Sequence, residues 1–363
     1  MMRRRKPMTT WLLYGATGYT GKLIVQEAAE RGLRPVLAGR NKEKVQPLAE
    51  QLGLEFRIFE LNNRTAAHLE GIDLVLHCAG PFEKTSKPMI HACLEAGAHY
   101  LDITGEIGVF EYTHSLHEEA EKKNIVLCSG VGFDVIPTDC TALKLKQALP
   151  DAIELALGFD SDSGISPGTM KTMVEGLGGG NMIRKDGQLA AVAIGKHQRM
   201  IDFGRGPKSA MAIPWGDVAT AYYTTGIPNI TAWIPTPKAA VKAARFMNVA
   251  SPLLSSGKVK RPLMKWIERR VKGPDEEERA GSAAYIWGQA KNADGVVKTC
   301  RIDTANVYDL TVYGALEVTQ RLLSGGYPGG SWTPAALFGP DLLESLPGSG
   351  RFEIDSFYPG TAN

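Results

Sequence analysis

The chain has 363 residues, with 41 Lys and Arg against 39 Asp and Glu, a formal net charge of +2 and 44% hydrophobic residues. These proportions are typical of a globular protein and exclude the disordered, collagen-like and small disulfide-framework classes. The length suggests about two domains, because single cores rarely grow beyond roughly 250–300 residues.

The five cysteines cannot all pair within the chain, and no CxxC or Cys/His spacing indicates a metal site. We therefore expect no metal and a reduced, cytoplasmic compartment. The basic start at residues 1–6 is followed by an apolar run that is too short for a signal peptide. No run of about 18 apolar residues occurs, so we expect no transmembrane helix.

The first 140 residues alternate short apolar runs with segments of helical composition. The predicted strands cover 11–14, 35–38, 55–59, 73–79, 99–103 and 125–128, and the predicted helices 21–31, 41–52, 86–96 and 109–123. Strands that alternate with helices of this size predict βαβ units. The fold class is therefore α/β, with an N-terminal Rossmann domain built on a doubly wound parallel sheet.

A glycine-rich segment follows the first predicted strand and opens the first predicted helix. Its candidate cofactor-binding residues are Gly15, Thr17, Gly18, Tyr19, Thr20 and Gly21. In this pattern the glycines allow a tight turn, close approach of the backbone to a pyrophosphate, and close packing of helix on strand. The helix N-terminus offers N–H groups to phosphates. The pattern predicts a dinucleotide site, and a glycine-rich turn without a ligand is the alternative.

The end of the second predicted strand indicates which dinucleotide binds. NAD-binding folds place an acidic residue there, whereas this chain has Gly39, Arg40 and Asn41, and Glu43 is the first acid after them. An arginine can hold a 2′-phosphate bidentately, and a carboxylate would repel it. The segment favours NADP(H); the alternative is a solvated helix start with ordinary surface cations.

A third candidate segment closes the fourth predicted strand, with Cys78, Ala79, Gly80 and Pro81. Ligands of doubly wound folds bind at the carboxyl ends of the strands, so a turn of small residues there would let a nicotinamide ribose lie against the backbone. A strand-end turn with no ligand is the alternative.

Two further segments carry a family resemblance: Tyr100–Glu106, which reads YLDITGE, and Gly132–Asp139, which reads GFDVIPTD. Together with the three segments above, they make the chain resemble the saccharopine dehydrogenase-like oxidoreductases, most of all the branch with the mycobacterial trans-acting enoyl reductases. The resemblance implies an NADP-binding Rossmann domain over 1–140, to which 303–363 return, and a second α+β domain over 141–302.

The second half is consistent with that arrangement. Strands are predicted at 153–159, 283–291 and 296–302, the last two around the hairpin signal Asp294-Gly295, and a helix at 308–323. We expect this domain to hold a mixed or antiparallel sheet, and a homodimer through it is a further possibility.

Residues 239–272 form a basic, amphipathic stretch that includes Trp266. Such a stretch can pack between domains, contact a second subunit, or lie on an anionic membrane surface as a peripheral contact. Domain packing is the plainest of the three interpretations. Nucleic acid is not an expected partner, because the basic character is local and recognition modules are absent.

Hydride transfer often requires a proton donor beside the cofactor. Candidates at predicted strand ends are Lys84, Tyr100, Asp102, Glu106, Asp134 and Asp139. Of these we favour Tyr100, Asp102 and Lys84 as catalytic residues, since their segments face the expected crevice. The alternative for Asp102 is a structural role, accepting backbone hydrogen bonds in a turn.

Three functional hypotheses follow. The first is an NADP(H)-dependent oxidoreductase that reduces the C=C (enoyl) bond of an acyl or lipid-like substrate. The second is a dehydrogenase of C–N or C–O bonds in a small metabolite, and the third is a non-catalytic NADP-binding scaffold. We favour the first.

Overall fold

The computed structural model describes residues 10–164, 170, 180–242, 262, 266, 270–271 and 273–358. The chain divides into two compact units, each assembled from separate stretches. The first unit takes Met1–Asp134 and Tyr308–Leu337, and the second takes Val135–Val307 and Phe338–Asn363.

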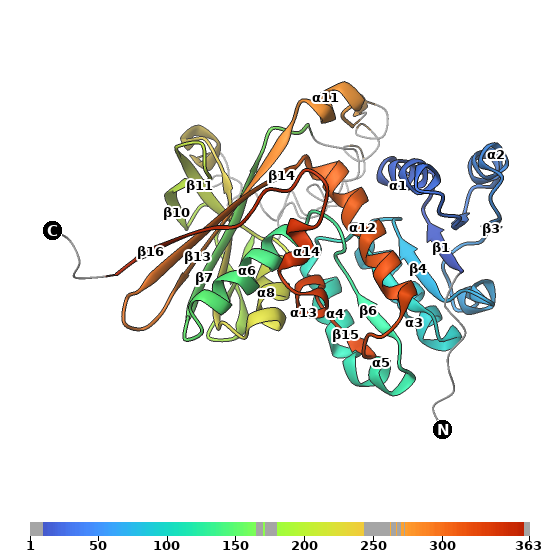
Figure 1. Cartoon of the computed structure of the whole chain (residues 1–363), viewed down its shortest axis with the longest axis horizontal. Helices are drawn as coiled ribbons and strands as arrows, with labels where there is room; N and C mark the ends of the chain where they lie inside the picture. Colours follow the sequence, from blue (N-terminus) through green and yellow to red (C-terminus); the bar gives the residue numbers. More distant parts are fainter. Residues whose placement is uncertain are drawn as a thin grey trace. The chain divides into compact units, whose positions relative to one another are not determined.

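The first unit is built on a sheet of seven parallel strands (Figure 1). They are β1 (Trp11–Tyr14), β2 (Val36–Gly39), β3 (Phe56–Ile58), β4 (Leu74–His77), β5 (His99–Asp102), β6 (Val126–Cys128) and β15 (Gly330–Ser331). Their spatial order is β15-β6-β5-β4-β1-β2-β3. The order reverses between β1 and β4, which confirms the predicted doubly wound Rossmann sheet.

Helices cover both faces of this sheet. They are α1 (Tyr19–Glu30), α2 (Lys42–Leu52), α3 (Phe82–Ala96), α4 (Ile107–Ser115), α5 (His117–Lys123) and α12 (Val307–Ser324), with a 3-10 turn at Thr65–Leu69 and the short α13 (Pro334–Phe338). Leu12 of β1 and Met89 of α3 belong to the same hydrophobic core on one face of the sheet. Leu13, the next residue of β1, faces the opposite side of the sheet and is equally buried. Continuous burial on both faces explains why the strands read as unbroken apolar runs.

Two predicted helices differ in detail from the structure. The helix expected at 86–96 begins earlier, at Phe82, because the Glu106 carboxylate accepts hydrogen bonds from the N–H groups of Phe82 and Glu83. The helix expected at 109–123 is two helices, since the backbone of Leu116 leaves helical geometry between α4 and α5.

The second unit contains a mixed nine-stranded sheet, as expected. Its main path runs β10-β11-β12-β7-β13-β14-β16, and β8 and β9 form a hairpin beside β12. The bounds are β7 (Glu154–Ser161), β8 (Asn181–Lys185), β9 (Gln188–Val192), β10 (Gln198–Asp202), β11 (Pro207–Ile213), β12 (Asn229–Pro235), β13 (Ala283–Lys291), β14 (Val297–Ala305) and β16 (Glu353–Phe357). Only the β7–β12 pair is parallel among these pairings.

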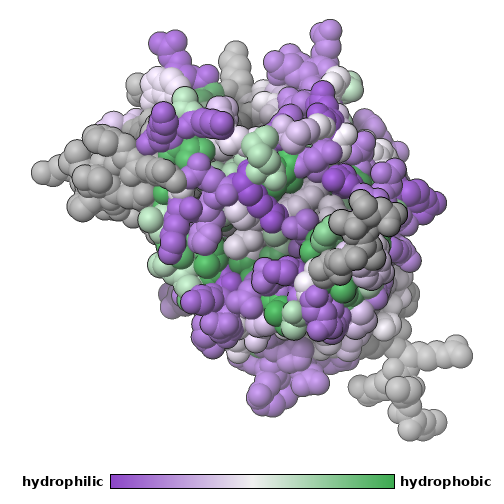
Figure 2. Space-filling model, turned by 90° about the vertical axis from the view of Figure 1, so that its left-hand side faces the viewer, coloured by the Kyte–Doolittle hydropathy of each residue, from purple (hydrophilic) through white to green (hydrophobic). Residues whose placement is uncertain are grey.

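Helices α6 (Ile136–Ala148) and α8 (Asp217–Thr225) cover one face of this second sheet (Figure 1). Leu145 of α6 packs with Leu157 and Ile230 in that core. Two short helices, α11 (Glu276–Ala280) and α14 (Asp341–Glu344), complete the unit. The side of the molecule drawn at the left in Figure 1 is mostly hydrophilic, and hydrophobic residues show there in small groups (Figure 2).

The end of the chain differs from its expected placement. Residues 303–363 were expected to return together to the Rossmann domain, and Tyr308–Leu337 do lie in the first unit. The remainder belongs to the second unit, because β16 pairs with β14 over Glu353–Phe357. Helix α6 likewise places the division at Asp134 rather than at residue 140.

Most of the basic stretch at 239–272 lies outside the described residues, so its proposed membrane or subunit contact stays a prediction. Among the helices that the structure describes, none is long and apolar enough to span a membrane.

Candidate functional site

Two of the predicted cofactor segments meet where the strand order reverses. The N–H of Cys78 donates to the carbonyl of Tyr14 at 2.8 Å, so the ends of β4 and β1 run side by side. Gly15 has a φ of +90°, and a Cβ added to it would lie 2.8 Å from the backbone N of Ala79. Only glycine fits at this position, and the approach holds the β1 and β4 turns together.

The start of α1 has the features of a phosphate-binding turn. Gly18 is exposed and caps α1 without a side-chain hydrogen bond. Gly21 is buried, and a Cβ there would collide with the carbonyl oxygen of Gly15. The half-buried Thr17 and Thr20 flank this turn, and its geometry suits close approach of a pyrophosphate to backbone N–H groups.

Tyr19 occupies the first turn of α1, and its ring packs edge-on against Tyr308 of α12, with centroids 5.1 Å apart. The aromatic contact ties the predicted cofactor loop to a helix from the end of the chain. Tyr19 as a whole is half-buried.

The candidate residues at the end of β2 and just after it have different surroundings. Gly39 is the buried last residue of β2. Asn41 caps α2, where its side chain accepts a hydrogen bond from the N–H of Lys44 at 3.0 Å. Arg40 is exposed, and in the described part of the chain its guanidinium has no hydrogen bond or ion pair. Arg40 is therefore the better placed of the two to hold a 2′-phosphate.

The β4 turn continues into α3. Cys78 and Ala79 are half-buried, Gly80 is exposed, and Pro81 is the N-cap of α3. Burial raises the pKa of the Cys78 thiol, so it is neutral at physiological pH. Lys84 is exposed in the first turn of α3. Its position on this edge is compatible with its predicted catalytic role.

Tyr100 and Asp102 lie in the core instead of on the accessible edge. Both have an exposed fraction of 0%, and the Tyr100 hydroxyl donates to Asp102 Oδ2 at 2.8 Å. Asp102 also accepts from the Ser129 hydroxyl at 2.9 Å and from two backbone N–H groups, those of Thr104 at 3.0 Å and Gly130 at 2.9 Å.

This hydrogen bonding corrects the expectation that the pair touches a substrate. Burial raises the pKa of the Asp102 carboxyl, although the four hydrogen bonds lower it, and burial together with Asp102 raises the pKa of Tyr100 well above its usual value. Asp102 joins the end of β5 to the loop after β6, which is the structural role kept open as the alternative.

Asp134 is the carboxylate on this edge with the most unusual environment. It is half-buried, and the structure records no hydrogen bond or ion pair for its side chain with the described residues. A Cβ added to Gly105, beyond β5, would lie 3.1 Å from Asp134 Oδ2. Burial raises the pKa of Asp134 to about 7.

The loop that carries Asp134 is firmly held. The N–H of Val131 donates to the Asp102 carbonyl at 2.8 Å, and the N–H of Phe133 donates to the Thr311 hydroxyl of α12 at 3.0 Å. Asp134 is thus a fixed, accessible carboxyl that exchanges protons near neutral pH, which suits a general acid or base.

The other strand-end acids have structural partners. Glu106 caps α3, as described above. Asp139 lies in α6 of the second unit, where it is buried and accepts a hydrogen bond from the Thr224 hydroxyl at 2.5 Å. Among the described residues, no group of three or more His, Cys, Asp or Glu side chains is arranged to hold a metal ion.

Comparisons with known proteins agree with this geometry. Residues 11–128 match the family model of the saccharopine dehydrogenase NADP binding domain. The chain is 30% identical to a saccharopine dehydrogenase-like oxidoreductase of Rattus norvegicus over 202 residues, which cover 48% of this chain and 47% of the relative. It is also 30% identical to a trans-acting enoyl reductase of Mycobacterium tuberculosis over 183 residues, covering 46% and 44%.

The chain spans about half the length of these curated relatives. Among solved structures, the apo saccharopine dehydrogenase (L-Glu forming) of Saccharomyces cerevisiae aligns with a TM-score of 0.67 at 12% identity, covering 96% of this chain and 100% of that one. The two proteins therefore share a fold. Residues 11–128 are similar to the saccharopine dehydrogenase NADP binding domain, which confirms the expected resemblance and supports NADP(H) as the cofactor.

Proposed function

We propose that the protein is an NADP(H)-dependent oxidoreductase that reduces a C=C bond conjugated to the carbonyl of an acyl substrate. The observation that carries the proposal is Asp134, a fixed and accessible carboxyl with a pKa of about 7 on the same sheet edge as the dinucleotide turn. The enoyl reductase name among the relatives supports the choice of bond.

The residues of the turn suit the cofactor. Gly15 and Gly21 leave room that a Cβ would fill, and Gly18 leaves the start of α1 without a side-chain cap. Arg40 follows β2, the position at which this fold binds the adenosine 2′-phosphate, and its planar guanidinium can donate two parallel hydrogen bonds to a phosphate. When bound, NADPH supplies a hydride to an electrophilic carbon.

Reduction of a C=C bond adds one hydride and one proton. In our proposal the protonated Asp134 carboxyl gives the proton to the carbon that becomes negative. Asp102 and Tyr100 act as positioning residues, since Asp102 holds the loop between β6 and Asp134 through Gly130 and Val131. Lys84 is kept as a candidate for binding the substrate carbonyl.

The first test is a fluorescence titration of the purified chain with NADPH and with NADH at fixed salt. Arg40→Ala removes a bidentate phosphate contact and is expected to weaken NADPH binding about ten- to a hundredfold, with little change for NADH. Lys42→Ala, an exposed cation two residues away, is the matched control. Equal weakening for both cofactors would contradict the 2′-phosphate assignment.

The second step follows NADPH oxidation with an enoyl thioester, an imine and a ketone as substrates. Consumption with the enoyl thioester alone supports the proposed bond. Turnover of the imine or ketone instead would favour the C–N or C–O dehydrogenase, and binding of NADPH without any turnover would favour the scaffold.

A further inference from the structure

The second unit contains a half-buried arginine, Arg199, that contacts the rings of two tryptophans. Arg199 of β10 lies with its Cζ 4.8 Å from the ring centroid of Trp233 and 4.5 Å from that of Trp287. Both indoles are buried, with exposed fractions of 6% and 3%. Such stacking attracts the cation through the faces of the rings.

The strand register explains why the rings of Trp233 and Trp287 both lie beside Arg199. Trp233 of β12 and Trp287 of β13 are both opposite Gly158 of the intervening strand β7. Because Gly158 has no side chain, β7 places no side-chain atoms between the two indoles at this register position. The guanidinium of Arg199 fills that gap, flanked by the rings.

The edge of the guanidinium remains without an acceptor. Its Nη1 donates to the side-chain oxygen of Gln289 at 3.2 Å, but Nε and Nη2 are buried and have no hydrogen-bond partner among the residues that the structure describes. These two nitrogens lie side by side on one edge of the planar group, and this edge forms bidentate pairs with oxyanions. Cation–π contacts do not satisfy such N–H donors.

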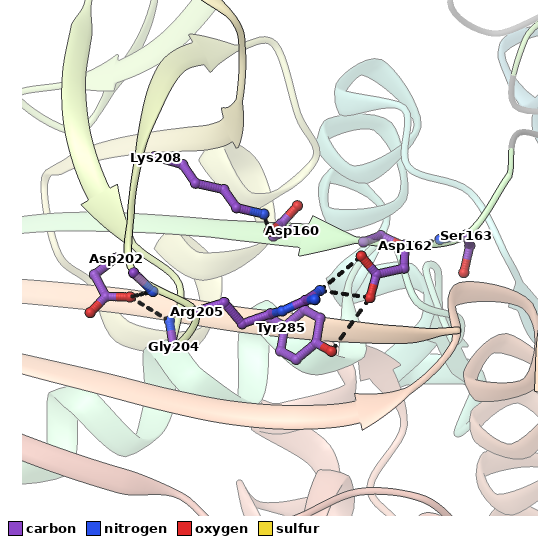
Figure 3. Close-up of polar contacts among 10 residues, drawn as sticks. Asp160, Asp162, Ser163, Asp202, Gly204, Arg205, Lys208 and Tyr285 are labelled. Carbon is purple, nitrogen blue, oxygen red and sulfur yellow. Dashed lines mark hydrogen bonds and ion pairs between the residues drawn. The ribbon is translucent and has the colours of Figure 1, made fainter. Parts of the chain in front are cut away.

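Three acids of the same unit, Asp160, Asp162 and Asp202, have other partners (Figure 3). Asp160 pairs with Lys208 at 2.5 Å, and Asp162 accepts two hydrogen bonds from Arg205 at 2.7 and 2.9 Å. Asp202 accepts the N–H groups of Gly204 and Gly206 at the tip of the β10–β11 hairpin. Each of these carboxylates is committed to its own donors, whereas a buried cation normally requires a paired anion.

A second unpartnered group lies beside Arg199. The carbonyl of His197 accepts the N–H of Ala212, which extends the β10–β11 ladder by one pair. Residues two apart on a strand share a face, so His197 and Arg199 face the same way. His197 Nε2 is also buried, and within the described part of the chain it has no hydrogen-bond partner.

We propose that Arg199 is the anchor of a binding site for a ligand carboxylate, received by the Nε–Nη2 edge between Trp233 and Trp287. A carboxylate continues the plane of the guanidinium between the two rings, whereas a tetrahedral phosphate would press oxygens against them. The site lies on β10, the edge strand of the sheet, and it stands independently of the reduction proposed above.

The test uses tryptophan fluorescence of the full chain, titrated with sodium hexanoate at constant ionic strength made up with chloride. Inorganic phosphate is titrated in parallel. A saturable change with hexanoate is expected, because two of the six tryptophans flank the site. Arg199→Met is expected to weaken this binding by about tenfold or more, the equivalent of one lost bidentate pair.

Arg205→Met is the matched control. Arg205 also stacks on an aromatic ring, that of Tyr285 at 4.7 Å, but its edge is already paired with Asp162, so its loss is expected to leave hexanoate affinity unchanged. If Arg199→Met does not fold, Arg199→Lys keeps the charge without the planar fork, and the same weakening is expected.

Thermal unfolding separates a binding role from a structural one. Hexanoate is expected to raise the melting temperature of the wild type but not that of Arg199→Met, and the variant alone is expected to melt no lower than the wild type, since it removes an unpaired buried charge. Equal hexanoate binding in Arg199→Met, or no saturable change in the wild type, would overturn the proposal. Binding of phosphate in place of hexanoate would overturn the carboxylate assignment.

Discussion

Asp102 ends β5 and Asp134 lies in the loop after the neighbouring strand β6, yet their carboxyl groups have opposite surroundings. Asp102 has no exposed surface and accepts four hydrogen bonds, whereas Asp134 is half-buried and has no recorded partner among the described residues. The comparison teaches that burial alone does not assign a role. Four hydrogen-bond donors give the buried Asp102 carboxyl a structural role. Asp134 lacks such donors among the described residues, and its carboxyl titrates near neutral pH.

The largest expected effect on stability comes from Asp102→Ala. This change leaves two hydroxyls and two N–H groups without their acceptor in the core, so the free energy of unfolding is expected to fall by about 3–5 kcal/mol. Urea denaturation measures it. Asp102→Asn keeps the shape and one acceptor oxygen, and a loss as large as that of alanine would contradict the hydrogen-bond explanation.

Asp134→Asn is expected to act on catalysis instead. Loss of a general acid lowers kcat by about a hundredfold or more, with little change in NADPH affinity. In the wild type, kcat for reduction is expected to fall as the pH rises through about 7, where Asp134 loses its proton. Single-turnover NADPH oxidation from pH 5 to 9 measures both effects, and an unchanged profile in the variant would exclude Asp134 as the acid.

The same variant tests the electrostatics without any substrate. The pKa of Asp134 is raised in the folded state, from 3.8 to about 7, so the folded protein favours the protonated form. Its contribution to stability is complete below pH 4 and is lost as the pH rises through 7. Asp134→Asn stays neutral, so it is expected to match the wild type at pH 4 and exceed it by about 1–2 kcal/mol at pH 8, allowing for partial exposure.

The smallest expected effect is that of Tyr100→Phe. It removes one of the four donors to Asp102 and leaves the ring in place, so we expect a loss of about 1 kcal/mol. NADPH affinity and kcat are expected to stay within about twofold of the wild type, because Tyr100 reaches the Asp134 loop only through Asp102. A large selective fall in kcat would restore Tyr100 as a proton donor.

Local patterns account for the confirmed predictions, which are the Rossmann sheet and the NADP(H) cofactor. The glycine spacing from Gly15 to Gly21 and the absence of an acid beside Arg40 are readable in one short window. Parallel strands end at a common edge, so the turns after β1, β2 and β4 had to converge once the strands were recognised.

The roles of individual polar residues depended on partners far along the chain. Asp102 is saturated by Ser129 and Gly130, which lie 27 and 28 positions later. Asp134 differs because its loop brings no donor to it. The sequence places both acids at strand ends, and nothing local distinguishes the saturated carboxylate from the titrating one.

Arg199 had no sequence signal at all. Its site requires Gly158, Trp233 and Trp287, which lie on three different strands, to be aligned in register. Arg199 itself lies on a fourth strand. The alternation in each strand predicts only which residues face the same side. The pairing of strands fixes the site, and that pairing is a property of the whole sheet.

The strand β15 also constrains how the protein is made. Gly330 and Ser331 pair with β6, so while the chain is being synthesised that edge of the sheet stays unpaired until Val135–Val307, the larger stretch of the second unit, has been made. A truncated fragment ending near residue 140 would expose the same edge permanently and would lack the Thr311 hydroxyl that holds Phe133. Exposed strand edges promote aggregation, so nascent chains of this protein are expected to depend on chaperones more than a contiguous Rossmann domain would.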